Sequence, residues 1–221
     1  RFICPSNFLE QQLLRQKEYE GKTLTLHNFI ELRDFDDKEE KENYVLFFGR
    51  LSEEKGLKPF LEACKELPNI NFKIAGVGPL LNDIKNISNV EYVGFKTGEE
   101  LNKLIQKAKF SVYPSVWYEN CPLSILESES LGTPVITANY GGMKELVKDN
   151  ETGILIDTVN KQTLKNAIQS LYNDDDLIMK MHKKCIQERE NMITMDSYIK
   201  ELLKIYDSVL GEKYENCNDR T

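Results

Sequence analysis

The stretch from Tyr44 to Ile156 alternates short apolar runs with segments of helical periodicity, and this alternation restricts the possible folds more than any other feature. The apolar runs are rich in β-branched and aromatic residues and are bounded by Gly, Pro or Asn. They are continuous rather than interrupted by polar residues, which indicates strands buried on both faces. The predicted strands are Tyr44–Phe48, Phe72–Ala75, Val90–Val93, Phe110–Tyr113, Pro134–Thr137 and Gly153–Ile156.

Helical segments separate these runs, as a sheet of parallel strands with crossover helices requires. We therefore predict an α/β fold for residues 41–160, in which helices cover both faces of a Rossmann-like, doubly wound parallel sheet. The predicted helices are Gly56–Leu67, Pro79–Asn86, Gly98–Ala108, Pro122–Leu131 and Gly142–Val147.

Only helical patterns follow Asp157, and we expect residues 161–221 to form C-terminal helices that pack on the sheet domain. The last helix has an apolar stripe, which fits packing but could also dock a separate domain. The stripe consists of Leu202, Leu203, Tyr206 and Leu210, and the predicted helices are Lys161–Tyr172, Asp175–Arg189 and Ser197–Leu210.

Residues 1–40 have a different pattern from the sheet domain. Phe2–Cys4 is a predicted strand, Ser6 or Asn7 can cap a following helix, and Thr23–Ile30 is extended. The charged run Asp34–Lys41 is predicted to be a solvated linker. Because the chain opens on Arg1 rather than Met, we expect it to be a fragment of a longer protein.

The charge and cysteine content restrict partners and compartment. A formal net charge of -7 opposes non-specific nucleic-acid binding, which depends on Lys and Arg. The five cysteines are odd in number and scattered, and no pair has the close spacing of a zinc site. We expect a protein of a reducing, cytoplasmic compartment that binds no metal and no nucleic acid.

Ligands of parallel α/β sheets bind at the carboxyl ends of the strands, so the loops after the predicted strands are the candidate site. The first loop, Gly49–Gly56, carries Arg50 and Lys55. Arg can hold phosphate oxygens with two parallel hydrogen bonds and Lys acts as a point charge, so the pair suits a diphosphate. The alternative is that both cations are solvated and paired with Glu53 and Glu54.

The next two loops are rich in glycine. Gly76 and Gly78 allow a backbone to come close to a ligand, or form a tight turn before a helix. The dinucleotide-binding motif needs a third Gly, and this sequence does not have one at that position. The loop Gly94–Thr97 can border a planar base, or can be only a turn.

The fourth loop joins a strand to a helix and carries two acids eight residues apart, Glu119 and Glu127. Pro122 at the helix start leaves backbone N–H groups available to an anion. Glu119 is predicted to lie in the loop and Glu127 on the helix. The alternative for Glu127 is that its carboxylate only stabilises the helix, through a favourable interaction with the helix dipole near the N-terminus.

Four segments of the chain resemble, in their residues and their order, the retaining glycosyltransferases of family 4, also called glycosyl transferases group 1. Their order is that of the second, donor-binding domain of the two-domain GT-B fold, and the similarity spans about Tyr44 to Asp157. In this resemblance, residues 1–40 correspond to a remnant of the N-terminal acceptor domain, which ends in its interdomain linker near His27 and Asn28. The segments are Gly49–Gly56, Ala75–Pro79, Trp117–Glu127 and Gly132–Ile136.

The resemblance implies a role for each matching residue. Glu119 would be the catalytic residue beside the transferred sugar, Arg50 and Lys55 would hold the donor diphosphate, and Glu127 would bind the ribose hydroxyls. The remaining donor-binding residues would supply backbone contacts, or would border the base. They are Gly49, Gly76, Asn120, Cys121 and Leu123, and, at the base, Gly94, Phe95 and Lys96.

The implied activity is that of a hexosyltransferase of cell-surface polysaccharide synthesis. Its donor would be a UDP- or GDP-sugar, and it would use neither metal nor other cofactor, because the two cations and the helix terminus stabilise the diphosphate. The acceptor would be a sugar or a lipid-linked sugar, bound through an N-terminal domain that this chain largely lacks. A lipid-linked acceptor would bring the full-length protein to a membrane surface.

Asn120 and Cys121 depart from the small or glycine-rich residues common in the family at these positions, which bears on the choice of sugar. With only a remnant of the first domain, the chain is expected to bind donor but to transfer sugar poorly. The alternative is a non-catalytic module for nucleotide-sugar binding or protein interaction. A Rossmann dehydrogenase would need a third glycine and an acid about 20 residues further on, and neither is present.

Overall fold

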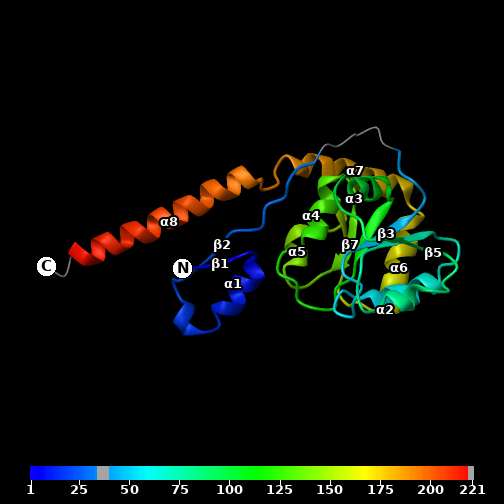
Figure 1. The fold of residues 1–221 in the computed structure, drawn as a ribbon, viewed down its shortest axis with the longest axis horizontal. Coiled ribbons are helices and arrows are strands. Elements are labelled where there is room, and N and C mark those ends of the chain that lie inside the picture. Colours follow the sequence, from blue (N-terminus) through cyan, green and yellow to red (C-terminus); the bar gives the residue numbers. More distant parts are fainter. Residues whose placement is uncertain (34–39, 219–221) are drawn as a thin grey trace.

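The computed structural model describes residues 1–33 and 40–218, with side chains described up to Gly211. Most of the predicted linker Asp34–Lys41 lies outside the described residues. The fold consists of a small N-terminal unit, a sheet domain and a long C-terminal helix (Figure 1).

Six parallel strands form the main sheet, in the order β5-β4-β3-β6-β7-β8. The chain starts at the centre of the sheet, builds one edge and then returns to build the other, so the direction of winding switches between β3 and β6. This confirms the predicted α/β fold with a doubly wound parallel sheet. The strands are β3 Val45–Phe48, β4 Phe72–Ala75, β5 Val90–Gly94, β6 Phe110–Tyr113, β7 Val135–Ala138 and β8 Gly153–Ile156.

Side chains of alternate residues along β3 enter different core clusters. Val45 and Phe47 pack with α2 and α6, whereas Leu46 and Phe48 pack with α3. Helices therefore cover both faces of the sheet, as its continuous apolar strands predict. The helices are α2 Leu57–Lys65, α3 Gly98–Lys107, α4 Leu123–Ser130, α5 Met143–Leu146, α6 Lys161–Tyr172 and α7 Asp175–Arg189.

The predicted helix Pro79–Asn86 is wrong, because the structure has only a 3₁₀ turn there, η2 Leu81–Ile84. The segment is short and contains Asn82 and Asp83, whose side chains compete with helical hydrogen bonds. Asn86 then takes a φ of 69°, which an α-helix does not accommodate.

The N-terminal unit contains a two-stranded parallel sheet of β1 Phe2–Cys4 and β2 Thr23–Thr25, with α1 Asn7–Leu13 and the 3₁₀ turn η1 Lys17–Tyr19 between them. Ser6 caps α1, as the sequence predicts, because its hydroxyl accepts a hydrogen bond of 3.2 Å from the Leu9 N–H. The predicted extended piece Thr23–Ile30 is a strand only as far as Thr25.

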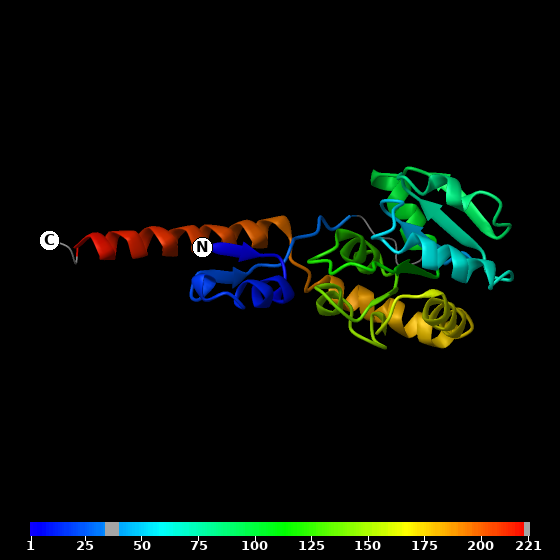
Figure 2. The ribbon, with the colours of Figure 1, turned by 90° about the horizontal axis from the view of Figure 1, so that it is seen from below.

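The last helix, α8 Met195–Asn218, extends away from the sheet domain on the side of the N-terminal unit (Figures 1 and 2). This differs from the expectation that it packs on the sheet. The Tyr198 ring contacts Phe29, with centroids 5.2 Å apart, near the start of the helix. Further along, Leu203, Tyr206 and Leu210 are each 53% exposed. Among the described residues, no helix is both long enough and apolar enough to cross a membrane.

Candidate functional site

A cavity of about 510 Å³ opens at the carboxyl ends of β3, β4 and β5, beside the N-terminal half of α4. Three strand-to-helix loops and α4 contribute to its lining, so residues far apart in sequence meet at the switch point of the sheet. Six of the predicted site residues line it, namely Gly49, Arg50, Gly76, Phe95, Lys96 and Glu127.

Gly76 is required by the close approach of two loops. Its φ is +140°, and a Cβ atom there would lie 1.8 Å from the carbonyl oxygen of Gly49. The Gly49 N–H in turn donates to the Ala75 carbonyl at 3.0 Å. Only glycine fits this contact, and the backbone of both loops is therefore exposed to the cavity.

Arg50 reaches the cavity with most of its side chain exposed. Its Nε lies 4.0 Å from Glu54 Oε1, which is too long for a hydrogen bond. The carboxylate of Glu53 pairs with Lys58 instead. The guanidinium thus remains able to bind an anion in the cavity.

Lys55 belongs to a polar cluster beside this cavity rather than to its lining. Its Nζ donates to Glu119 Oε1 at 2.6 Å and to the Tyr113 hydroxyl at 2.9 Å. The Ser115 hydroxyl donates to the same Glu119 oxygen at 3.0 Å. Burial acts to lower the pKa of Lys55, but the hydrogen bonds to Glu119 and Tyr113 outweigh it and raise this pKa. The sequence did not identify Tyr113 and Ser115, although both flank the loop that carries Glu119.

Helix α4 begins directly after Pro122, and no described side chain caps its start. Ser124, in its first turn, lines the cavity and lies near Gly49, whose added Cβ would be 4.0 Å from the Ser124 hydroxyl. A helix N-terminus facing a cavity favours an anion there. The sequence pointed to the backbone N–H groups of this first turn, but not to the Ser124 hydroxyl.

Glu127 lies one turn further along α4 and lines two adjoining cavities. Burial raises the pKa of its carboxyl group, and the positive charge of Arg33 acts in the opposite direction. Arg33 lines the second cavity, of about 250 Å³, together with Glu127 and Leu123. The linker before the sheet domain therefore reaches the predicted ribose residue.

Besides Lys55 and Glu119, four other predicted residues lie outside the lining of the larger cavity. Leu123 lines the smaller one, and Gly94 accepts a hydrogen bond of 3.0 Å from the Gly76 N–H. Cys121 is buried, and its carbonyl accepts from the Asn28 amide at 3.2 Å. The Asn120 carbonyl packs so closely on Gly142 that a Cβ there would lie 1.5 Å from its oxygen. Asn120 and Cys121 thus hold the loop in place through their carbonyl groups.

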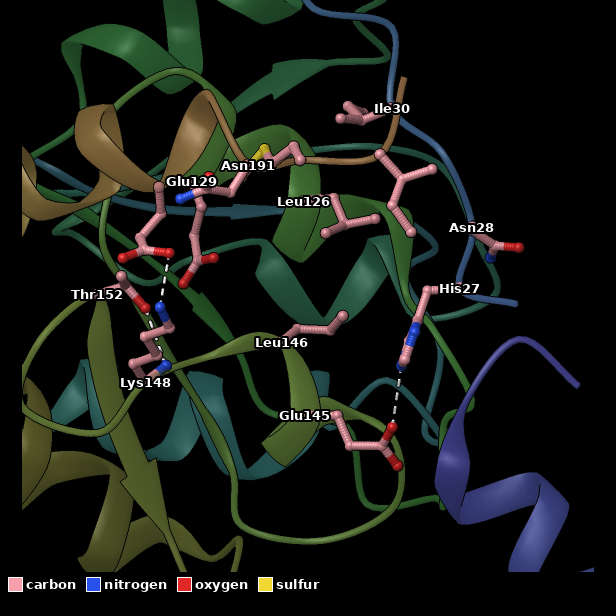
Figure 3. A pocket seen from close by; sticks show the side chains of 13 residues that line it. His27, Asn28, Ile30, Leu126, Glu129, Glu145, Leu146, Lys148, Thr152 and Asn191 are labelled. Atoms are coloured by element: carbon pink, nitrogen blue, oxygen red, sulfur yellow. Dashed lines mark hydrogen bonds and ion pairs between the residues drawn. The ribbon is translucent and has the colours of Figure 1, made fainter. Parts of the chain in front are cut away.

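Figure 3 shows a third cavity, of about 210 Å³, where the linker and the segment after α7 meet α4 and α5. His27 on the linker hydrogen-bonds Glu145 at 3.1 Å. Glu129 on α4 is 3% exposed, and its Oε1 is without a partner among the described residues. Burial raises the pKa of Glu129 to about 8.

The fold and the cavity at its switch point define an α/β protein that can bind an elongated anionic ligand. The family model for glycosyl transferases group 1 matches residues 28–192. The chain therefore belongs to the group 1 glycosyltransferases, as the sequence motifs predict.

An uncharacterized glycosyltransferase of Methanocaldococcus jannaschii is 28% identical over 183 residues, which are 80% of this chain and 51% of the relative. A Campylobacter jejuni protein is 32% identical over 159 residues, which are 67% of this chain and 44% of that protein. It is named as an alpha-1,4-N-acetyl-D-galactosaminyltransferase for a GalNAc-containing diNAcBac-PP-undecaprenol. The chain spans about half the length of the curated relatives it matches.

Among solved structures, the Anabaena protein HepE in complex with UDP is similar, with a TM-score of 0.83 and 18% identity. The match covers 93% of this chain and 63% of HepE. At this level of identity the similarity concerns the fold, and it agrees with the prediction that the sheet domain is one half of a GT-B structure.

Proposed function

We propose that this chain is the donor-binding half of a retaining glycosyltransferase that uses a nucleoside-diphosphate sugar. The observation that carries the proposal is the convergence of Gly49, Arg50, Gly76 and Glu127 on one cavity of about 510 Å³ at the switch point. Phe95 and Lys96 also line this cavity, and the base of the nucleotide would lie beside them. UDP is the first donor nucleotide to test, because HepE was solved with UDP.

The diphosphate would lie between Arg50 and the start of α4, and would attract Lys55 away from Glu119. In the structure Lys55 and Glu119 are joined by a hydrogen bond of 2.6 Å, and both side chains are largely shielded from solvent. A diphosphate offers Lys55 more negative charge than one carboxylate does. Its arrival would leave Glu119 available to the sugar, in the catalytic role that the family resemblance implies.

The chemical step transfers the sugar from the diphosphate to an acceptor hydroxyl, which loses its proton. Negative charge develops on the departing nucleoside diphosphate, and Arg50, the α4 N-terminus and a Lys55 released from Glu119 would stabilise it. This electrostatic task needs no metal and no other cofactor. The groups that bind and orient the acceptor hydroxyl would come from the N-terminal domain.

We further propose that a separate N-terminal domain completes the acceptor site, since the chain spans about half of its relatives. The acceptor would be a sugar or a lipid-linked sugar, as the name of the Campylobacter jejuni relative suggests. A lipid-linked acceptor would bring the full-length protein to the cytoplasmic face of a membrane. Four free, buried thiols, those of Cys4, Cys64, Cys121 and Cys185, fit a reducing compartment.

Calorimetric titration of the purified chain with UDP and GDP tests the diphosphate assignment. Replacing Arg50 and Lys55 together by Ala should weaken binding at least tenfold, because hydrogen bonds to charged groups are worth about 1.5–3 kcal/mol each. The control is Lys58→Ala, which removes an exposed lysine paired with Glu53. Unchanged affinity in the double variant would show that the assignment is wrong.

The ribose assignment is tested by comparing UDP with inorganic pyrophosphate. Glu127→Ala should weaken UDP binding while leaving pyrophosphate binding nearly unchanged, because only UDP carries the ribose hydroxyls. Equal losses for the two ligands would remove the ribose role. Efficient sugar transfer by the 221-residue chain alone would contradict the view that it is half of an active site.

A further inference from the structure

Three apolar side chains are exposed in succession on the loop before α4. Val116 is 41% exposed, Trp117 66% and Tyr118 69%. Large exposed aromatic groups that lie together are typical of binding surfaces. Trp117 is the only tryptophan of the chain.

Hydrogen bonds hold this loop in place on both sides of Trp117. The Val116 N–H donates to the Glu54 carbonyl at 3.0 Å, and the Trp117 N–H donates to the Ser115 hydroxyl at 3.3 Å. After the tryptophan, the Glu119 N–H donates to the Trp117 carbonyl at 3.0 Å. Little ordering entropy therefore remains to be lost when a ligand contacts the indole.

Tyr118 is engaged by the fold, unlike its neighbour. Its ring stacks on Phe8 of α1 at 5.5 Å and meets Tyr140 edge-on at 5.4 Å. These contacts anchor the loop between the N-terminal unit and the sheet domain. Trp117 is thus presented from a fixed turn, with two thirds of its surface in solvent.

Trp117 is two residues from both Ser115 and Glu119, which belong to a polar cluster that suits hydroxyl groups. Glu119 Oε1 accepts from Lys55, 2.6 Å away, and from Ser115, 3.0 Å away. A pyranose has an apolar face of C–H groups and a rim of hydroxyls, so it needs an aromatic surface beside charged hydrogen-bonding groups. This loop offers both within three residues.

We infer that Trp117 is a stacking platform for a pyranose ring at the entrance of the Lys55–Glu119 cluster. The inference deepens the proposed function and depends on it. The ring could belong to the donor's own sugar or to the acceptor, and both sources share the chemistry that an indole recognises.

Intrinsic fluorescence tests this inference directly, because all tryptophan emission comes from Trp117. The chain is titrated with UDP, with UDP-glucose, UDP-galactose, UDP-N-acetylglucosamine and GDP-mannose, and with methyl glycosides of the same sugars in saturating UDP or GDP. We expect at least one sugar to shift the emission to shorter wavelength and to reduce acrylamide quenching about twofold or more. A response to a nucleotide sugar alone identifies the donor's sugar, and a response to a methyl glycoside identifies an acceptor ring.

Variants separate stacking from an indirect change of the loop. In calorimetry, Trp117→Ala should lower the affinity for the responding sugar about three- to tenfold, as expected for the loss of an aromatic contact. The affinity for the nucleotide alone should be unchanged. Trp117→Phe should recover part of the loss, and the neighbouring Val116→Ala serves as the control.

The outcomes distinguish the two proposals. If the nucleotide binds but no sugar changes Trp117 emission, or if Trp117→Ala binds the responding sugar normally, the platform is overturned and the donor site stands. If neither UDP nor GDP binds and no sugar alters the emission, both proposals are overturned.

Discussion

Glu129 is a buried acid whose ionisation should set much of the pH dependence of stability. Its side chain lies on α4 with one oxygen unpartnered among the described residues. Burial raises its pKa from 4.5 to about 8, although a hydrogen bond with Thr152 and the positive charge of Lys148 act in the opposite direction. The substitution to test is Glu129→Gln, which keeps the shape and removes the ionisation.

The sign of the effect follows from proton linkage. Below pH 4.5 the carboxyl group is protonated in both the folded and the unfolded chain, so its ionisation costs no stability. As the pH rises, the unfolded chain releases the proton while the folded chain keeps it, and the free energy of unfolding falls by about 1.4 kcal/mol per pH unit. The loss ends near pH 8, where the folded chain also ionises.

Between pH 5 and pH 7 this linkage amounts to about 3 kcal/mol. The Gln variant has no such slope, although its unpaired amide costs about 1–2 kcal/mol at every pH. Urea unfolding of both proteins should therefore show that the free energy of unfolding of the variant increases relative to that of the wild type as the pH rises. With a urea m-value of about 2 kcal/mol/M, the relative midpoints move by about 1.5 M over this range.

Glu62→Gln provides the matched control, because Glu62 is exposed on α2 and its replacement removes one carboxylate without any burial. Its unfolding curves should follow those of the wild type across this pH range. If the Glu129→Gln curves also run parallel to the wild type, Glu129 is ionised and partnered in the folded protein. The argument from its burial would then be refuted.

Three further substitutions test other parts of the structure. Glu145 is hydrogen-bonded to the His27 ring and accepts from the Asn7 and Phe8 N–H groups at the start of α1, and these bonds outweigh burial and lower its pKa. Glu145→Gln should therefore cost about 2 kcal/mol in urea unfolding at pH 7, with the difference shrinking as the pH falls below 4.5. Gly76→Ala places a methyl group against a backbone carbonyl, so we expect it to lower the free energy of unfolding by about 3 kcal/mol and to abolish UDP binding in calorimetry. Phe60→Ala removes a fully buried ring and should cost about 3–5 kcal/mol in urea, while the folded protein binds UDP with normal affinity. A pH-independent Glu145→Gln effect, normal UDP binding by Gly76→Ala, or a Phe60→Ala cost below about 1 kcal/mol would contradict the respective arguments.

Much of the sheet could be predicted because buried parallel strands leave a strong local signal. The strand Phe72–Ala75 and the helices Lys161–Tyr172 and Asp175–Arg189 have the predicted bounds. In each, a capping or breaking residue coincides with the end of the apolar pattern. The failure at Pro79–Asn86 concerns a segment whose apolar spacing suits either a 3₁₀ turn or an α-helix.

The candidate site was predictable only in its strand-end residues. Gly49, Arg50, Gly76 and Glu127 meet in one cavity because parallel strands end at the same edge of the sheet. The pairing of Lys55 with Glu119, and the burial of Glu129, depend on contacts across the fold. Sequence distance carries no information on them, since Lys55 and Glu119 are 64 residues apart.

The β3–β6 contact at the centre of the sheet also has a consequence for folding. Strands β3, β4 and β5 are consecutive in the chain, as are β6, β7 and β8, so each half pairs mainly with its own neighbours. Val45–Phe110 and Leu46–Ser111 pair across the seam between the halves, and a long stretch of chain must close before these pairs form. A ligand that contacts both Arg50 and Glu127 bridges this seam, so donor binding should slow the hydrogen exchange of the β3–β6 amides most.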